Sequence, residues 1–198
     1  VTYTLVPPMS VRLPDTFTYR QARSLGLSKR RLYALRDAGD IELVSRGLYR
    51  RRDAALVDED LLELATRSDT ATLCLGTALS RQQLSDEIPA ARDVAIPRGT
   101  RPPATRAQVR WHTFDPATFK VGRELVAVQE SITIGQYGPE RSILDAFRLR
   151  GHEGHELGYE ALRRWLRRPG AQPAALLAMA KHFPRALTPL RQALEVLL

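Results

Sequence analysis

Residues 15–50 carry the spacing of two short helices joined by a tight turn, followed directly by a hairpin. Gly26 suits the turn between the helices, and Ser28 is a good N-cap for the second helix. Leu32 and Leu35 fall on one face of that second helix. Three residues from the first helix and the turn are expected to complete a small core: Ala22, Leu25 and Leu27. The pattern therefore predicts a helix-turn-helix over this segment.

The outer face of the second helix is rich in cations. Lys29, Arg30 and Arg31 occupy its first turn, where the helix dipole is positive and cations are mildly disfavoured. The outward face also carries Tyr33, Ala34 and Asp37, with Arg36 beside it. A DNA phosphate and a base edge would compensate the cations at the start of a recognition helix. The alternative is a solvated basic face without a ligand.

The residues after the second helix predict a two-stranded wing. Residues 41–45 alternate loosely as a strand, Arg46 and Gly47 supply a turn, and residues 48–52 return. The returning strand ends in Arg50, Arg51 and Arg52, which we expect to meet phosphates. The full set of DNA-binding candidates is Thr18, Tyr19, Arg20, Ser28, Lys29, Arg30, Arg31, Tyr33, Arg36, Arg46, Arg50, Arg51 and Arg52.

The net charge of +8 is concentrated in the same part of the chain. Residues 1–56 hold 11 Arg or Lys against 5 Asp or Glu, whereas residues 57–198 hold 19 against 17. Because 27 of the 30 basic residues are Arg, the abundance of arginine reflects a compositional bias, and its placement is more informative. That placement is typical of a nucleic-acid-binding module.

Composition favours a cytoplasmic protein of one large or two small domains. No apolar run approaches the roughly 20 residues that span a membrane. Residues 1–8 lack the charged start and sustained apolar stretch of a signal peptide. The single Cys74 lies in an apolar context, which is typical of a small core residue in a reducing compartment.

The predicted fold class is α+β. A winged helix-turn-helix domain is expected over residues 1–57, with residues 1–14 as an extended leader. A mixed α/β domain with a small sheet and a C-terminal helical bundle is expected over residues 58–198. Its predicted helices are 58–67, 73–84, 139–148, 156–168, 173–182 and 188–198, and its predicted strands are 93–97, 109–114, 125–128 and 132–137. Residues 98–106 are predicted to form an exposed loop. In the N-terminal domain, the extra helix that usually precedes a winged helix-turn-helix is not found.

This arrangement resembles the AbiEi family of antitoxins from type IV toxin–antitoxin and abortive-infection systems. The segments that carry the likeness are 17–28, 35–39, 46–50, 76–79, 93–99, 111–112, 137–147, 159–162 and 176–180. The resemblance implies a protein that represses its own operon through the winged helix. It also implies that the C-terminal domain opposes a partner toxin that resembles a nucleotidyltransferase.

Exposed arginines of the second domain are candidates for this neutralising role. They would contact an acidic face of the toxin or compete for its nucleic-acid substrate. The set comprises Arg98, Arg101, Arg106, Arg163, Arg164, Arg167 and Arg168, of which the last four form the favoured cluster. Solvated arginines without a partner are the alternative.

No catalytic or cofactor-binding pattern is found, so neither an enzyme nor a cofactor is expected. His152 and His155 are three positions apart rather than the four of a zinc-binding HExxH helix, and Gly151 and Gly154 favour a loop there. His112 is expected to be a satisfied, partly buried side chain. Arg141 and Asp145 are spaced for an i, i+4 ion pair.

Two other functions stay open. A metabolite-responsive winged-helix repressor would need an apolar pocket with a few convergent polar groups. A nucleic-acid enzyme would show turnover that depends on His112 or His152. Related chains that continue into a nuclease need a metal-binding Asp and a Glu-x-Lys, but after Asp145 only helices and Lys181 are predicted.

Overall fold

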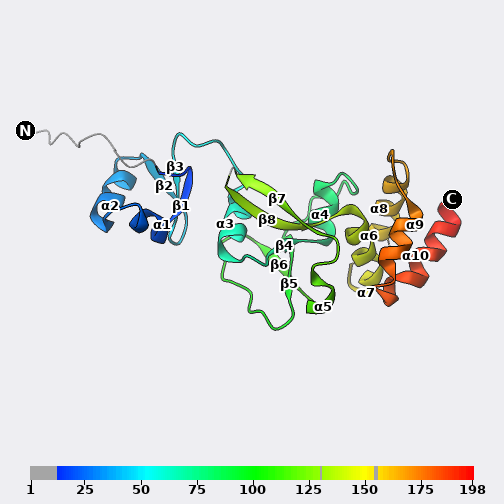
Figure 1. The fold of residues 1–198 in the computed structure, drawn as a ribbon. Coiled ribbons are helices and arrows are strands. Elements are labelled where there is room, and N and C mark those ends of the chain that lie inside the picture. Colours follow the sequence, from blue (N-terminus) through cyan, green and yellow to red (C-terminus); the bar gives the residue numbers. More distant parts are fainter. Residues whose placement is uncertain (1–12, 130, 154–155) are drawn as a thin grey trace, which may run out of the picture. The chain divides into compact units, whose positions relative to one another are not determined.

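The computed structural model describes residues 13–129, 131–153 and 156–198. The chain divides into two compact units, Val1–Glu59 and Asp60–Leu198 (Figure 1). Each unit has its own buried clusters. Most of the predicted leader, residues 1–12, lies outside the described residues. No described helix is both long enough and apolar enough to cross a membrane.

The N-terminal unit combines two helices with a three-stranded antiparallel sheet. Its elements are β1 (Thr16–Thr18), α1 (Tyr19–Ser24), α2 (Lys29–Asp37), β2 (Ile41–Ser45) and β3 (Leu48–Arg51). The two predicted helices and the predicted hairpin are present. The sheet order is β1-β3-β2, so the hairpin gains a third strand that was not predicted. In β1, Phe17 pairs with Tyr49 of β3, and their rings stack 5.9 Å apart.

One apolar cluster holds this unit together. Leu32 and Leu35 of α2 are buried, as predicted, against residues of every other element and the turn. The buried members of the cluster are Leu13, Phe17, Ala22, Leu27, Leu32, Leu35, Ile41 and Tyr49. The prediction for Leu25 was wrong: its side chain is 40% exposed. Leu25 is the C-cap of α1, where the chain turns through Gly26 (φ +84°), and Leu27 takes the inward position instead.

The second unit is built on a mixed five-stranded sheet of order β6-β5-β4-β8-β7. Its strands are β4 (Thr72–Leu73), β5 (Arg92–Pro97), β6 (Val109–Phe114), β7 (Arg123–Gln129) and β8 (Ile132–Tyr137). The β4–β8 and β5–β6 pairs are parallel, whereas β4–β5 and β7–β8 are antiparallel. The prediction of a helix directly after Thr72 was wrong, because Thr72 and Leu73 form the buried central strand and the helix begins at Leu75.

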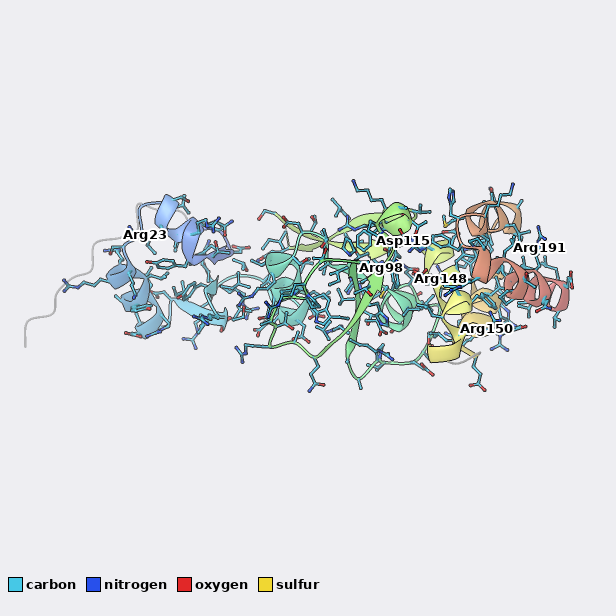
Figure 2. All side chains as sticks on the ribbon, turned by 90° about the horizontal axis from the view of Figure 1, so that it is seen from below. Arg23, Arg98, Asp115, Arg148, Arg150 and Arg191 are labelled. Carbon is cyan, nitrogen blue, oxygen red and sulfur yellow. The ribbon has the colours of Figure 1, made fainter. Side chains whose placement is uncertain are left out.

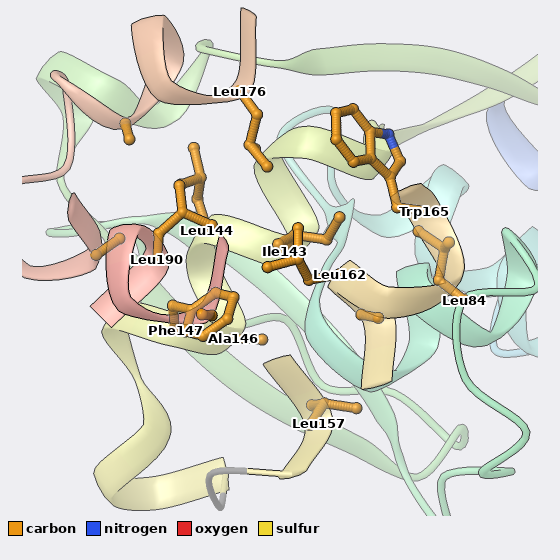
Figure 3. Close-up of a cluster of buried hydrophobic side chains, with 14 of the residues drawn as sticks. Leu84, Ile143, Leu144, Ala146, Phe147, Leu157, Leu162, Trp165, Leu176 and Leu190 are labelled. Atoms are coloured by element: carbon orange, nitrogen blue, oxygen red, sulfur yellow. The ribbon is translucent and has the colours of Figure 1, made fainter. Parts of the chain in front are cut away.

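Helices form the rest of this unit. They are α3 (Glu59–Arg67), α4 (Leu75–Arg81), α5 (Pro116–Phe119), α6 (Pro139–Arg148), α7 (Arg150–Glu153), α8 (Glu156–Leu166), α9 (Pro173–Ala180) and α10 (Pro184–Leu197). The four longest C-terminal helices, α6, α8, α9 and α10, share one core, in which Ile143, Leu162 and Leu190 are fully buried (Figure 3). Pro139 occupies the first turn of α6, as predicted.

Several helix boundaries differ from the predictions: α4 ends at Arg81, α8 at Leu166 and α9 at Ala180, each two or three residues earlier than predicted. Two further differences concern α7 and α10. Residues 150–153 form a helical turn rather than a loop, because α7 follows α6 after the single residue Leu149 and the Arg150 side chain donates to the Phe147 carbonyl. The last helix begins at Pro184 rather than Thr188 and continues through Pro189. Burial of Leu190 and Leu194 stabilises α10 despite the hydrogen bond that Pro189 cannot donate.

Candidate functional site

Each of the helices α1 and α2 begins at a side-chain hydroxyl that serves as its N-cap. Thr18 and Gln21 form a capping box on α1, in which the Gln21 amide donates to Thr18 Oγ1 at 3.2 Å and the Thr18 amide donates to Gln21 Oε1 at 2.7 Å. Ser28 Oγ accepts from the Arg31 amide at 3.2 Å, which confirms the predicted N-cap of α2. Thr18 and Ser28, both predicted to bind DNA, therefore have a clear structural role as caps.

Lys29 and Arg30 begin α2 on its exposed side. The Arg30 side chain makes no hydrogen bond or ion pair with any residue that the structure describes. Lys29 Nζ lies 5.6 Å from the Tyr33 ring centroid, and the Arg36 guanidinium lies 4.9 Å from the same centroid. Arg36 also pairs with Asp37 at 2.9 Å, which raises the pKa of its guanidinium. The exposed face of α2 thus presents an aromatic ring between two cations, with Arg30 open to a ligand.

The three arginines at the end of the wing have different surroundings. Arg50 is buried, its Nε donates to Glu42 Oε1 at 2.7 Å, and a second ion pair joins it to Glu59 at 3.5 Å. Arg51 binds the carboxylate of Asp53, an ion pair that raises the pKa of the arginine and lowers that of the aspartate. Arg52 is exposed. Among these three, Arg52 is best placed to reach a phosphate.

The remaining candidates of this unit lie on its surface. Tyr19 and Arg20 are exposed at the start of α1, Arg46 is exposed in the hairpin turn, and Arg31 is half-buried. Arg23 is a further exposed cation of α1 that the sequence reasoning missed (Figure 2). Its position three residues after Arg20, on the same helical face, is the signal that could have identified it.

Residues 10–52 match the family model described as a transcriptional regulator, AbiEi antitoxin. The N-terminal unit is therefore similar to that of AbiEi antitoxin regulators. The match confirms the inferred resemblance for the N-terminal unit, where it covers both helices and the hairpin. It supports a general role as an antitoxin or transcriptional regulator. A comparison with curated proteins finds no match to the chain.

In the second unit, the four clustered arginines are not equivalent. Arg164 pairs with Asp86 and donates to Glu160 Oε1 at 2.6 Å, and Arg168 donates to the Gln82 carbonyl. These two arginines connect α8 to the segment after α4. Arg163 and Arg167 are exposed and one helical turn apart, and their side chains make no polar contact with the described residues.

The remaining predicted arginines of this unit lie in the segment between β5 and β6. Arg98 is exposed and lies 3.9 Å from Asp115 at the start of α5 (Figure 2). Arg101 is exposed as well. Arg106 is held through its backbone, because its amide donates to the buried carboxylate of Glu63 at 2.8 Å.

The sequence did not predict the role of Asp93, a buried carboxylate of β5 that contacts side chains of β6. Asp93 Oδ1 accepts from Arg110 Nε at 2.7 Å and lies 2.9 Å from His112 Nε2. His112 is therefore satisfied and partly buried, as predicted. The signal lay in the parallel register, which pairs Asp93 with Arg110 and Ala95 with His112, so that the two basic residues flank one carboxylate.

The described residues contain no group of three or more His, Cys, Asp or Glu side chains arranged to hold a metal ion. The histidine motif considered in the sequence includes residues 154–155, which lie outside the described residues. Cys74, predicted to be a core residue, is fully buried and reduced.

Proposed function

We propose that this chain is an autorepressing antitoxin that binds the promoter DNA of its own operon through α2 and the wing. The observation that carries the proposal is Arg30: it is exposed at the start of α2, opposite the buried Leu32 and Leu35, and has no described partner. At this place in a helix-turn-helix module, a side chain reaches base edges in the major groove. Arg52 and Arg46 would then contact the phosphate backbone.

The family model that matches residues 10–52 is described as an antitoxin, and we extend that role to the second unit as part of the proposal. We propose that residues 58–198 counteract a nucleotidyltransferase-like toxin, and that Arg163 and Arg167 contribute most to this activity. Both side chains are exposed and have no polar contact with the described residues, whereas Arg164 and Arg168 hydrogen-bond to neighbouring segments of the unit. We propose that both promoter binding and toxin neutralisation take place in the cytoplasm, where the chain would encounter the operon DNA and the toxin.

DNA binding is tested with the purified full chain and a duplex that covers the region upstream of its operon. We expect a salt-sensitive complex and a footprint over inverted repeats whose centres lie about one helical turn, or a multiple of it, apart. A scrambled duplex of the same composition is the control. Equal affinity for the two duplexes would contradict sequence-specific repression.

Neutralisation is tested by co-expressing the full chain with the toxin encoded beside it. Arg163→Glu/Arg167→Glu should reduce protection while leaving promoter binding unchanged. Arg185→Glu/Arg191→Glu is the matched control, because these two arginines of α10 are also exposed and without a described partner. If both double variants protect as well as the parent, Arg163 and Arg167 are not the neutralising surface. If the parent itself gives no protection, the antitoxin assignment is wrong.

A small-molecule-responsive repressor is a second candidate function. It is favoured by one observation, a cavity of about 420 Å³ in the second unit that is lined by Asp93 and Arg110. The two functions differ in a simple measurement: a ligand of that cavity would change the affinity of the full chain for promoter DNA only in a responsive repressor.

A further inference from the structure

We propose that this cavity binds a small organic cation, with a guanidinium or ammonium group hydrogen-bonded to Asp93. The inference concerns a binding site in the second unit and holds whether or not the N-terminal unit represses an operon. It starts from a buried carboxylate oxygen, Asp93 Oδ2, that has no hydrogen-bond partner among the described residues.

Asp93 is fully buried, yet only one of its two oxygens is satisfied. Oδ1 accepts from Arg110 and faces His112, and the Asp93 amide donates to Thr77 Oγ1 at 2.8 Å. Oδ2 has no hydrogen-bond partner among the described residues. A buried acceptor without a partner is costly in free energy, so such an atom calls for a specific explanation.

Asp93 is one of the residues that line the cavity. Six of the residues that line the cavity are Gly76, Glu87, Pro89, Asp93, Arg110 and Leu157. A Cβ atom placed on Gly76 would lie 3.1 Å from Asp93 Oδ2 and 3.3 Å from Pro89 Cγ. Oδ2 is therefore next to Gly76 and lies just beneath the cavity lining, with no side chain of residue 76 above it.

The lining selects the class of ligand. An ionised carboxylate oxygen only accepts hydrogen bonds, so the ligand must present an N–H or O–H donor. Arg110 and Asp93 offset each other in charge, whereas Glu87 adds a negative charge at the exposed side of the cavity. An anion would be repelled by Oδ2, and a cation is attracted by both carboxylates. Pro89 and Leu157 supply apolar surface for an alkyl chain.

A metal ion fits this lining less well. No cluster of three ligating side chains occurs among the described residues, and the cavity is large compared with a single water molecule or ion. An alkylguanidinium or alkylammonium fills the space and donates a charge-assisted hydrogen bond to Oδ2.

The test uses the ¹⁵N-labelled full chain with n-butylguanidinium and n-butylammonium as probes. Butyrate, an anion of similar size, is the control probe. We expect one of the cations to shift the backbone amide signals of Gly76, Asp93 and Arg110 saturably, and butyrate to leave them unchanged. No saturable shift with either cation, or shifts that cluster elsewhere, would overturn the proposal.

Variants separate specific binding from a general charge effect. Gly76→Ala blocks the approach to Oδ2 and should weaken binding about tenfold or more, as expected for the loss of one charge-assisted hydrogen bond. Gly151→Ala is the matched control, because the added methyl group meets open space. Unchanged affinity in a folded Gly76→Ala chain would overturn the proposal.

The exposed Glu87 gives a second variant that leaves the fold intact. Glu87→Gln should weaken binding of the cation a few-fold, whereas Asp86→Asn, beside it in sequence but not among the six lining residues named above, should not. If Gly76→Ala fails to fold, the comparison of Glu87→Gln with Asp86→Asn tests the proposal instead. Equal affinity of these two variants and the parent for the cation would refute a cation site here.

Discussion

Arg141 Nε lies 3.0 Å from both carboxylate oxygens of Asp145, one turn further along α6, and neither side chain is exposed. Arg141 Nη1 also donates to the carbonyls of Thr118 and Val121, at 2.8 and 2.6 Å. Its guanidinium lies 4.2 Å from the Tyr137 ring centroid. Through this one side chain, α6 is connected to the segment around α5 and to the end of β8. The predicted ion pair is confirmed, and both of its side chains are fully buried.

Asp145→Asn should strongly destabilise the second unit. Arg148 Nε also donates to Asp145, at 2.6 Å, so the substitution leaves two arginines facing a neutral amide. Breaking a buried pair in this way costs about 3 to 5 kcal/mol. Glu160→Gln, which weakens a more exposed pair in α8, should cost less than about 1 kcal/mol. Urea unfolding of the full chain measures both, and equal midpoints would contradict the structural role of Asp145.

Arg30→Ala should weaken specific DNA binding by about 1 to 3 kcal/mol if Arg30 reads a guanine. Its stability should be unchanged, because the side chain has no described partner to lose. Arg191→Ala, which removes an exposed arginine of α10, serves as the control. Mobility-shift titrations at fixed salt provide the measurement, and parental affinity in Arg30→Ala would remove Arg30 from the interface.

The wing arginines should separate into a DNA contact and a structural residue. Arg52→Gln should make the slope of log K against log salt shallower by about 0.9, the amount for one phosphate contact on B-DNA. Arg50→Gln should instead lower the free energy of unfolding by about 1 to 3 kcal/mol, because it removes a mostly buried partner of Glu42. An altered slope at unchanged stability for Arg50→Gln would reverse this assignment.

The pairing of Asp86 with Arg164 should be visible in a pH titration. The hydrogen bond from Arg164 holds the pKa of the Asp86 carboxyl below its ordinary value. The pair therefore contributes stability above the pKa of an unfolded aspartate, and this contribution is lost as the pH falls through the lowered value. Carboxyl-carbon NMR should show the pKa of Asp86 rising in Arg164→Gln, while that of Asp53, which is lowered by Arg51, stays the same. An unchanged pKa of Asp86 in Arg164→Gln would show that the Asp86–Arg164 pair is not formed in solution.

Local signals in the sequence were sufficient for most helices and for the hairpin. Ser28 and Pro139 mark helix starts through chemistry confined to one turn, and the burial of Leu32 follows from its spacing. The strands β1 and β4 were missed because three and two residues are too few to show an alternation. Their formation depends on partners far along the chain, such as Gly135 for Thr72.

The candidate sites were predicted less completely for a related reason. The exposure of Arg30 follows from helical periodicity. The hydrogen bond from Arg50 to Glu42, in contrast, depends on the register of the hairpin. Arg164 and Asp86 are 78 positions apart, so no local pattern could show that this arginine is already paired. The role of Asp93 likewise required knowledge that β5 and β6 lie side by side.

The pairing of β1 with β3 has a consequence for the thermodynamics of DNA binding. Because Thr18 ends β1 and caps α1, and the Arg51 amide donates to the Asp15 carbonyl, the wing is tied by main-chain hydrogen bonds to the helices it flanks. A hairpin fixed in this way is already ordered in the free protein, so little chain entropy is left to lose on the duplex. Calorimetry should then give the modest heat-capacity change of rigid docking rather than the large negative value that accompanies coupled folding.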